Sequence, residues 1–374
     1  MTARRLVQIS TGLGAGNIGD ELMARAFWDE LPETIELDVE MFPEYVQQRE
    51  PYPEKHRYFP TDWEGATTVP AGIDGLLVGG TPVADWQGLH FPLEFIARRL
   101  RRFHQSGRTV DAVGVGVDRL EKPEARELFA RYFLPIGSWT VRTARCREAL
   151  LELGVPEERV LVGADWAWRY RPRRDLRRWG EEQWRELGVE AGRPLAVVNV
   201  VNEMWAGREE LRSALAAALD ELATVDGMQV AFFCNEMREG EYFDREASEQ
   251  VRARMRRPAA IVPNRYWGPE EALGLLAHAT VTVSLRYHFT VESVLAGTVP
   301  VNVVRGQKMA GLVEELGLAP VGTMERVEAE ELVAGVRSAV EQREELWGRL
   351  QEARRGLETR AGNNLALWRG REAA

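Results

Sequence analysis

Residues Val281 to Val304 read VTVSLRYHFTVESVLAGTVPVNVV, and this stretch decides the fold. An alternating apolar segment at its start predicts a strand at 281–285. Apolar residues with helical spacing follow at 289–296, and the turn Gly297-Thr298 leads into a second apolar strand at 301–304. Strand, helix and parallel strand within so few residues form a βαβ unit, which predicts an α/β protein with a parallel sheet.

Cationic residues lie where each strand of this unit ends. Arg286 and His288 follow the first strand, and Lys308 follows the second, so all three should lie at the carboxyl edge of one sheet. Ligands bind at that edge in open α/β sheets, and a helix N-terminus there favours an anion. The chain has only two other lysines, Lys55 and Lys122, among 48 basic residues, so a lysine at this place is unexpected for a neutral surface position. The pattern predicts an anion site; the alternative is a capping or core histidine beside a solvated arginine.

The rest of the chain repeats the alternation of apolar strands and helices in two sets. Expected strands lie at 6–9, 75–78, 109–117, 139–141 and 160–162 in the first set, and at 195–201, 229–233 and 260–262 in the second. This pattern predicts an α/β protein of two doubly wound Rossmann-like domains facing a cleft. We expect an N-terminal domain at 1–168, a connection at 169–190, a C-terminal domain at 191–345, and a C-terminal helix at 346–374 that packs back on the first domain.

A glycine-rich loop follows the first expected strand. Thr11 to Gly19 read TGLGAGNIG, and Asp20 is expected to cap a helix that runs to about Leu31. Such a loop lets the backbone approach a ligand closely, and its alternative role is a tight turn that packs helix on strand. It is not a P-loop, because no Gly-Lys-Ser/Thr follows. The elements between residues 32 and 70 are left unassigned.

Composition limits the classes of function. The chain has 374 residues and a net charge of −10, which argues against general nucleic-acid binding. Its two cysteines, Cys146 and Cys234, have no metal-ligand spacing and indicate a reducing compartment. No N-terminal signal peptide and no apolar run of about 20 residues is present, so we expect a cytoplasmic protein without a transmembrane segment.

Several motifs together resemble the polysaccharide pyruvyl transferase family. The Ser284-x-Arg286-x-His288 block, the ESVLAGTVPV helix and turn, Lys308 and the GLVEELGL segment at 311–318 are similar to its C-terminal signature. Gly-x-x-Asn-x-Gly-Asp-Glu at 14–21 is similar to its first motif, and the resemblance covers most of the chain. Three positions depart from the family pattern: Thr81 stands where a third glycine is usual, Thr143 replaces an acidic residue, and Arg305 stands where tyrosine is frequent.

The resemblance implies a GT-B-like enzyme that moves the enolpyruvyl unit of phosphoenolpyruvate onto a sugar diol, giving a pyruvate ketal and phosphate. It implies His288 as general acid, with Lys308 and Arg142, the arginine of a Val-Arg motif, as further catalytic residues. The donor would be bound by Arg286, Arg142, Lys308 and Ser284. The acceptor would contact Asn17, Asp20, Gly80, Thr81, Asn202, Trp205 and Asn235. It would be a lipid-linked cell-wall sugar, an exopolysaccharide unit or a small metabolite, and a lipid-linked acceptor would place the protein at the inner membrane face.

No metal or cofactor is expected, since no Asp-x-Asp motif is present and the five histidines are scattered. The cations should make the cleft locally positive despite the net charge. Two alternatives stay open at this stage: a GT-B glycosyltransferase with a nucleotide-sugar donor, and a non-catalytic family member that binds a glycan or metabolite. The sequence names neither the acceptor nor the oligomeric state.

Overall fold

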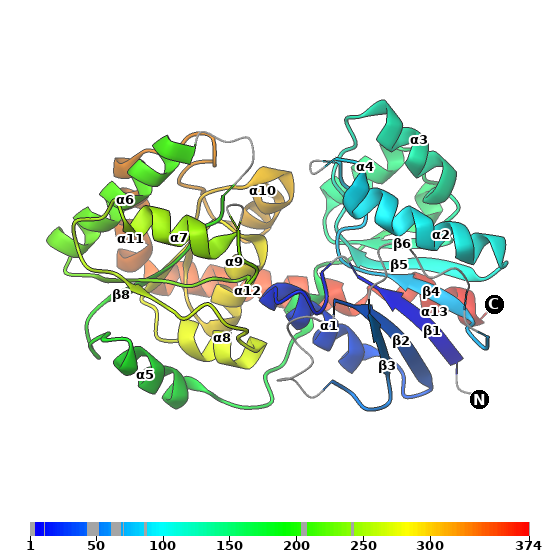
Figure 1. Ribbon diagram of the computed structural model, residues 1–374, viewed down its shortest axis with the longest axis horizontal. Helices are drawn as coiled ribbons and strands as arrows, with labels where there is room; N and C mark the ends of the chain where they lie inside the picture. The colour runs from blue at the N-terminus through cyan, green and yellow to red at the C-terminus, as the bar shows by residue number, and fades with distance from the viewer. Residues whose placement is uncertain are drawn as a thin grey trace. The chain divides into compact units, whose positions relative to one another are not determined.

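The computed structural model describes residues 4–10, 12–42, 52–60, 69, 71–85, 88–202, 208–240 and 243–373 (Figure 1). Contacts divide the chain into two compact units. The first comprises Met1–Ala15, Met23–Tyr170 and Gly356–Ala374, and the second comprises Gly16–Leu22 and Arg171–Arg355. The short segment Gly16–Leu22 therefore belongs to the second unit, although its neighbours in sequence belong to the first.

The first unit is built on a seven-stranded parallel sheet with the order β3-β2-β1-β4-β5-β6-β7. Its strands are β1 (Arg4–Ile9), β2 (Ile35–Met41), β3 (Arg57–Pro60), β4 (Gly75–Val78), β5 (Thr109–Val115), β6 (Ser138–Val141) and β7 (Val160–Val162). Among the described residues, six helical elements lie between its strands or after the last one: η1 (His90–Glu94), α2 (Phe95–Gln105), α3 (Pro123–Tyr132), α4 (Ala144–Glu152), η2 (Glu157–Arg159) and η3 (Trp166–Arg169), and α13 (Ala366–Ala373) follows near the end of the chain. Two further helices belong to it in part: α1 (Ile18–Glu30) from Met23 onward, and α12 (Arg343–Gly362) from Gly356 onward.

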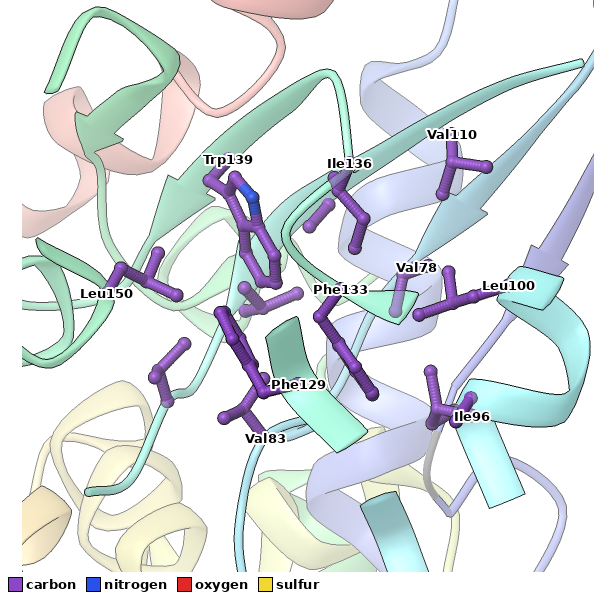
Figure 2. Packing of buried hydrophobic residues seen from close by; sticks show 14 of the residues in the cluster. Val78, Val83, Ile96, Leu100, Val110, Phe129, Phe133, Ile136, Trp139 and Leu150 are labelled. Carbon is purple, nitrogen blue, oxygen red and sulfur yellow. The ribbon is translucent and has the colours of Figure 1, made fainter. Parts of the chain in front are cut away.

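Aromatic side chains from one helix and one strand fill the core of the first unit (Figure 2). Phe129 of α3 and Phe133, which directly follows this helix, stack with ring centroids 5.5 Å apart, and the ring of Trp139 of β6 lies 6.1 Å from that of Phe129. All three are fully buried. Burial of each such side chain contributes roughly 1.5–3 kcal/mol, so this layer fixes α3 on the sheet.

The second unit is built on a five-stranded parallel sheet with the order β10-β9-β8-β11-β12. Its strands are β8 (Leu195–Asn199), β9 (Gln229–Phe232), β10 (Ala260–Ile261), β11 (Val281–Ser284) and β12 (Pro300–Asn302). Its helices are α5 (Arg177–Glu186), α6 (Arg208–Val225), α7 (Asp244–Arg252), α8 (Pro269–Leu276), α9 (Tyr287–Ala296), α10 (Gly306–Glu315) and α11 (Ala329–Glu341), with the start of α12.

The βαβ unit predicted from the sequence is β11, α9 and β12. The two strands pair in parallel, with Val283 opposite Val301. Helix α9 ends at Gly297, whose backbone is left-handed with φ 94°, a conformation that glycine adopts without steric cost. The turn therefore falls where the sequence placed it, and the chain returns to the same sheet.

One expectation about an individual element needs correction, and two other stretches contain elements that the sequence left unassigned. Asp20 does not cap α1: the helix begins at Ile18, and the Asn17 side chain accepts the backbone N–H groups of Gly19 and Asp20 at 3.0 and 3.4 Å. The unassigned residues 32–70 contain two strands, β2 and β3. The expected connection contains α5, whose Trp184 is buried in the core of the second unit.

The C-terminal residues from Gly356 onward are part of the first unit. Asn364 is fully buried there: its carbonyl accepts the hydroxyl of Thr140, and its amide donates to the carbonyl of Ala164, both at 2.8 Å. These bonds attach the C-terminal segment to β6 and to the loop after β7. Within the described part of the chain, no helix is both long and apolar enough to span a bilayer.

Candidate functional site

The turn between β11 and α9 is held by the buried hydroxyl of Ser284. This hydroxyl donates to the carbonyl of Arg286 at 2.8 Å and accepts the backbone N–H of Arg286 at 3.3 Å. The hydroxyl of Thr290 lies 2.9 Å from it and also lies 2.6 Å from the side-chain oxygen of Asn302, on β12. Ser284 thus shapes the turn that carries Arg286, and its direct contact with a donor stays a prediction.

The guanidinium of Arg286 pairs with two carboxylates of the second unit. Its Nε donates to Asp244 at 2.7 Å, and its Nη2 lies 2.5 Å from Asp244 and 3.1 Å from Glu236. Burial lowers the pKa of Arg286, but the carboxylates of Asp244 and Glu236 outweigh it and raise the pKa above its ordinary value. Arg286 therefore stays charged, and its charge is already balanced by these neighbours.

Asp244, the first residue of α7, joins the ends of three strands. Its carboxylate accepts the side-chain amide of Asn199 at 2.8 Å and the backbone N–H of Asn235 at 2.8 Å, in addition to Arg286. Burial raises the pKa of Asp244, and Arg286 only partly offsets that effect. These bonds hold the carboxyl ends of β8, β9 and β11 together.

A second buried carboxyl, Glu292, lies one helical turn after His288. With the Asn235 amide oriented so that its nitrogen faces this carboxyl, the nitrogen lies 2.7 and 2.9 Å from the two oxygens. Glu292 is fully buried, and burial together with the charge of Asp244 raises its pKa well above the ordinary value, while Arg286 lowers it. Helix α9 thus carries both His288 and the group that holds the side chain of Asn235.

The glycine-rich segment Gly16–Leu22 lies against the loop that follows β9. The N–H of Ile18 donates to the carbonyl of Asn235 at 3.0 Å, and the N–H of Met237 donates to the carbonyl of Gly16 at 3.2 Å. Between these bonds, Asn17 and Glu236 form an antiparallel bridge. The loop after β9 therefore places the first turn of α1 in the second unit.

Gly19 lies in direct contact with His288. A Cβ atom on Gly19 would overlap the imidazole at Cβ, Cγ and Nδ1. The backbone of the glycine-rich motif and the histidine of the C-terminal motif therefore touch, and only a residue without a side chain allows that approach. The sequence places these two motifs far apart, so their contact is a finding of the structure.

Lys308 lies in the first turn of α10, which follows β12 on the same sheet edge. Its side chain is half-buried, as is that of His288 at the start of α9. Because β11 and β12 are adjacent parallel strands, both helices begin at the carboxyl edge of the sheet. The edge thus presents two helix N-termini, each with a cationic or titratable side chain in its first turn.

Arg142 belongs to the first unit and is buried there. Its Nη1 pairs with Asp165 at 2.9 Å, its Nε donates to the carbonyl of Gly114 at 3.0 Å, and its Nη2 donates to that of Gly80 at 3.0 Å. Only 3% of the side chain is exposed. The predicted convergence of Arg142 with the residues of the second unit stays a prediction.

The remaining predicted acceptor residues are distributed over both units. Gly80 and Thr81 follow β4 in the first unit. Asn202 follows β8 in the second, where its amide nitrogen donates to Gln250 at 3.2 Å and its oxygen accepts Arg212 at 3.3 Å. Trp205 lies outside the described residues. Asn17, Asp20 and Asn235, by contrast, lie in the part of the second unit that contains His288.

Sequence reasoning missed three carboxyl residues of the site: Glu236, Asp244 and Glu292. Glu292 carried a usable signal, because it lies four residues after His288 and so on the same side of a helix. Glu236 also pairs with Arg238. The immediate surroundings of Arg286 are therefore rich in carboxyl groups, and the locally positive cleft expected from the sequence stays a prediction. Among the described residues, no group of three or more His, Cys, Asp or Glu could hold a metal ion.

Comparison with solved structures identifies the fold. A putative UDP-N-acetylglucosamine 2-epimerase from Listeria monocytogenes has a TM-score of 0.65 at 12% identity, over 99% of this chain and 97% of that one. A glycosyltransferase from Rickettsia africae has 0.63 at 12% identity, over 100% and 98%. A protein from Anabaena in complex with UDP-glucose has 0.62 at 14% identity, over 99% and 100%. The two Rossmann-like units thus form a GT-B-like fold.

The sequence profile of the polysaccharide pyruvyl transferase family matches residues 17–306. The match covers most of the chain and includes both the Asn17–Asp20 motif and the Ser284–His288 motif. The chain belongs to the polysaccharide pyruvyl transferase family. No curated protein matches it in sequence.

Proposed function

We propose that the protein transfers the enolpyruvyl unit of phosphoenolpyruvate to two hydroxyls of one sugar residue, forming a pyruvate ketal and releasing phosphate. Family membership supports a transferase that acts toward a polysaccharide. The observation that carries the finer proposal is the pair of helix N-termini at one sheet edge, with His288 in the first turn of α9 and Lys308 in the first turn of α10.

This edge suits a donor with a carboxylate and a phosphate. A helix N-terminus favours an anion through its unpaired N–H groups and its dipole, typically by 0.3–1 kcal/mol at an exposed site. Lys308 adds a mobile point charge that neutralises the departing phosphate. Because the guanidinium of Arg286 already pairs with Asp244 and Glu236, we propose that its main role is to hold the turn that carries His288.

The reaction needs one proton delivered to carbon. His288 donates it to the methylene carbon of phosphoenolpyruvate, which makes the adjacent carbon cationic and open to attack by the first sugar hydroxyl. The carbon–oxygen bond to phosphate then breaks, and the second hydroxyl closes the ketal on the same carbon. One hydroxyl proton restores His288 and the other leaves with phosphate, so atoms and charges balance. Holding both hydroxyls beside one carbon supplies the entropic part of catalysis.

A combined binding and product assay tests the proposal. Phosphoenolpyruvate at about 100 times its Kd should stabilise the protein by about 2.7 kcal/mol, whereas UDP-glucose should not. Incubation with phosphoenolpyruvate and a panel of sugar acceptors should release phosphate and give an acceptor whose mass has increased by one ketal-linked pyruvate. Stabilisation by UDP-glucose alone, with sugar transfer to an acceptor, would replace this proposal with a nucleotide-sugar glycosyltransferase.

A further inference from the structure

We infer that Glu292 is a positioning residue: through the side chain of Asn235 it fixes the loop after β9, and that loop holds the Gly16–Leu22 segment against His288. The part that concerns catalysis rests on the function proposed above. The part that concerns the segment does not, because it follows from contacts within the second unit alone.

The first link is the contact between two buried side chains. Asn235 is 1% exposed, Glu292 is fully buried, and the Asn235 amide nitrogen reaches both Glu292 oxygens at 2.7 and 2.9 Å. Removing one partner of such a pair leaves a buried polar group unsatisfied, which is far more damaging than losing an exposed contact. The contact joins α9 to the end of β9.

The second link is made by the backbone of the loop. The carbonyl of Asn235 accepts the N–H of Ile18, and the next residue, Glu236, forms the bridge with Asn17. A displacement of Asn235 therefore moves the acceptor on which the start of α1 depends. Asp244 holds the N–H of Asn235 on the other side, so the loop is fixed at its backbone and at its side chain.

The third link is the contact of Gly19 with the His288 ring. It completes a closed path from α9 through the loop after β9 and the Gly16–Leu22 segment back to α9. His288 lies half-buried in the first turn of its helix, and Gly19 contacts it from a different element. With the path intact, the backbone at Gly19 limits the orientations of the ring, and a misplacement of about 1 Å in such a group can lower turnover about 100-fold.

The contact between Glu292 and Asn235 depends on a hydrogen bond and does not require Glu292 to be charged. Burial and Asp244 raise the pKa of this carboxyl well above its ordinary value, which favours the neutral form. A glutamine has nearly the same shape, is neutral and can pair with the Asn235 amide. A methionine has similar length but cannot form that hydrogen bond, so the two substitutions separate hydrogen bonding from filling of space.

The experiment compares Glu292→Gln, Glu292→Met and Asn235→Ala with the parent protein. Amide hydrogen exchange of a peptide that covers residues 16–22 should rise about 5–150-fold in Glu292→Met and Asn235→Ala, the range expected for one lost buried hydrogen bond. It should stay near the parent rate in Glu292→Gln. The double variant Glu292→Met/Asn235→Ala should exchange no faster than the faster of the two single variants, because both substitutions remove the same contact.

Ser293→Ala is the matched control. Ser293 is the next residue on α9, is fully buried and is hydrogen-bonded to Thr282 of β11 instead of the loop after β9. Its substitution should leave exchange of residues 16–22 unchanged. If Glu292→Met is folded by circular dichroism and residues 16–22 exchange at the parent rate, Glu292 only fills space and the inference is wrong.

Turnover separates this inference from the proposed function. If pyruvyl transfer is measurable, Glu292→Met should lower kcat with little change in KM for phosphoenolpyruvate, and Glu292→Gln should restore it. Faster exchange of residues 16–22 with unchanged kcat would overturn the coupling to His288. If the parent protein shows no pyruvyl transfer, the proposed function fails, and the exchange rates still decide whether Glu292 holds the segment.

Discussion

His288 combines a titratable ring with a neighbour that lacks a side chain. The half-buried ring lies in the first turn of α9, and the backbone of Gly19 touches it from a segment far away in sequence. The contact limits the orientation of the ring, which stays half-buried.

Substitution of this residue tests its role as a proton donor. His288→Gln keeps a hydrogen-bonding group of similar size but removes the titrating proton, so kcat for ketal formation should fall about 10²–10⁴-fold. The Kd for phosphoenolpyruvate, measured by calorimetry, should change far less, because Lys308 and both helix N-termini remain. A variant with nearly parental kcat would show that another group supplies the proton.

At the scale of single elements, the β11–α9 turn is determined by a few buried hydroxyls. The hydroxyl of Ser284 forms hydrogen bonds both with the backbone of Arg286 and with the hydroxyl of Thr290. The turn therefore depends on a side chain that the family pattern also associates with donor binding. These two roles predict different kinetic results when the hydroxyl is removed.

Ser284→Ala should destabilise the protein by about 1–3 kcal/mol, because the buried partners of the hydroxyl lose a hydrogen bond. If the role is structural, as its burial indicates, the KM for phosphoenolpyruvate should stay within about twofold at a temperature where the variant is folded. Chemical denaturation and steady-state kinetics together measure both quantities. A large rise in KM without a loss of stability would instead support direct contact with the donor.

The same scale explains what sequence reasoning could and could not predict. The βαβ unit was predicted to within about two residues at each end, because an alternating strand and a left-handed Gly297 are local signals. Strand β2 was missed although its apolar residues alternate, because it also contains Asp38 and Glu40. Their charges are balanced by Arg5 of β1 and Arg99 of α2, partners that a local pattern does not reveal.

The candidate site shows the same limit. His288 and Lys308 were predicted because each follows an apolar strand, which is visible in a short stretch. Asp244 and Glu236 were missed because a carboxylate becomes part of the site only through an arginine that another strand supplies. A short stretch of sequence predicts which residues lie at the sheet edge. Which of their charges are paired is seen only when the strands are placed side by side.

At the scale of the whole molecule, the stability of the first unit should depend on pH through His56. Its Nδ1 accepts the N–H of Leu37 at 3.2 Å, and the residue is 4% exposed. Burial, with a smaller effect of Lys55, lowers the pKa of His56 from 6.5 to about 4. Because the folded-state pKa is the lower one, its contribution to stability is present above pH 6.5 and is lost as the pH falls through 4.

A shift of this size corresponds to about 3 kcal/mol. His56→Asn keeps an acceptor near the position of Nδ1 but does not titrate, so its stability should fall less between pH 6.5 and pH 4. Hydrogen exchange of a peptide covering β2, compared at both pH values for parent and variant, reports this difference within the first unit. Equal acid sensitivity of parent and variant would exclude His56 as the cause.

The position of Gly16–Leu22 has a consequence for biosynthesis. This segment leaves the ribosome about 270 residues before its partner His288. At about 5–20 residues per second, that delay is roughly 15–55 s, during which the first unit can fold around its own sheet. The catalytic histidine proposed here therefore meets its glycine only after that delay, and a separately expressed fragment that begins at Arg171 lacks that glycine altogether.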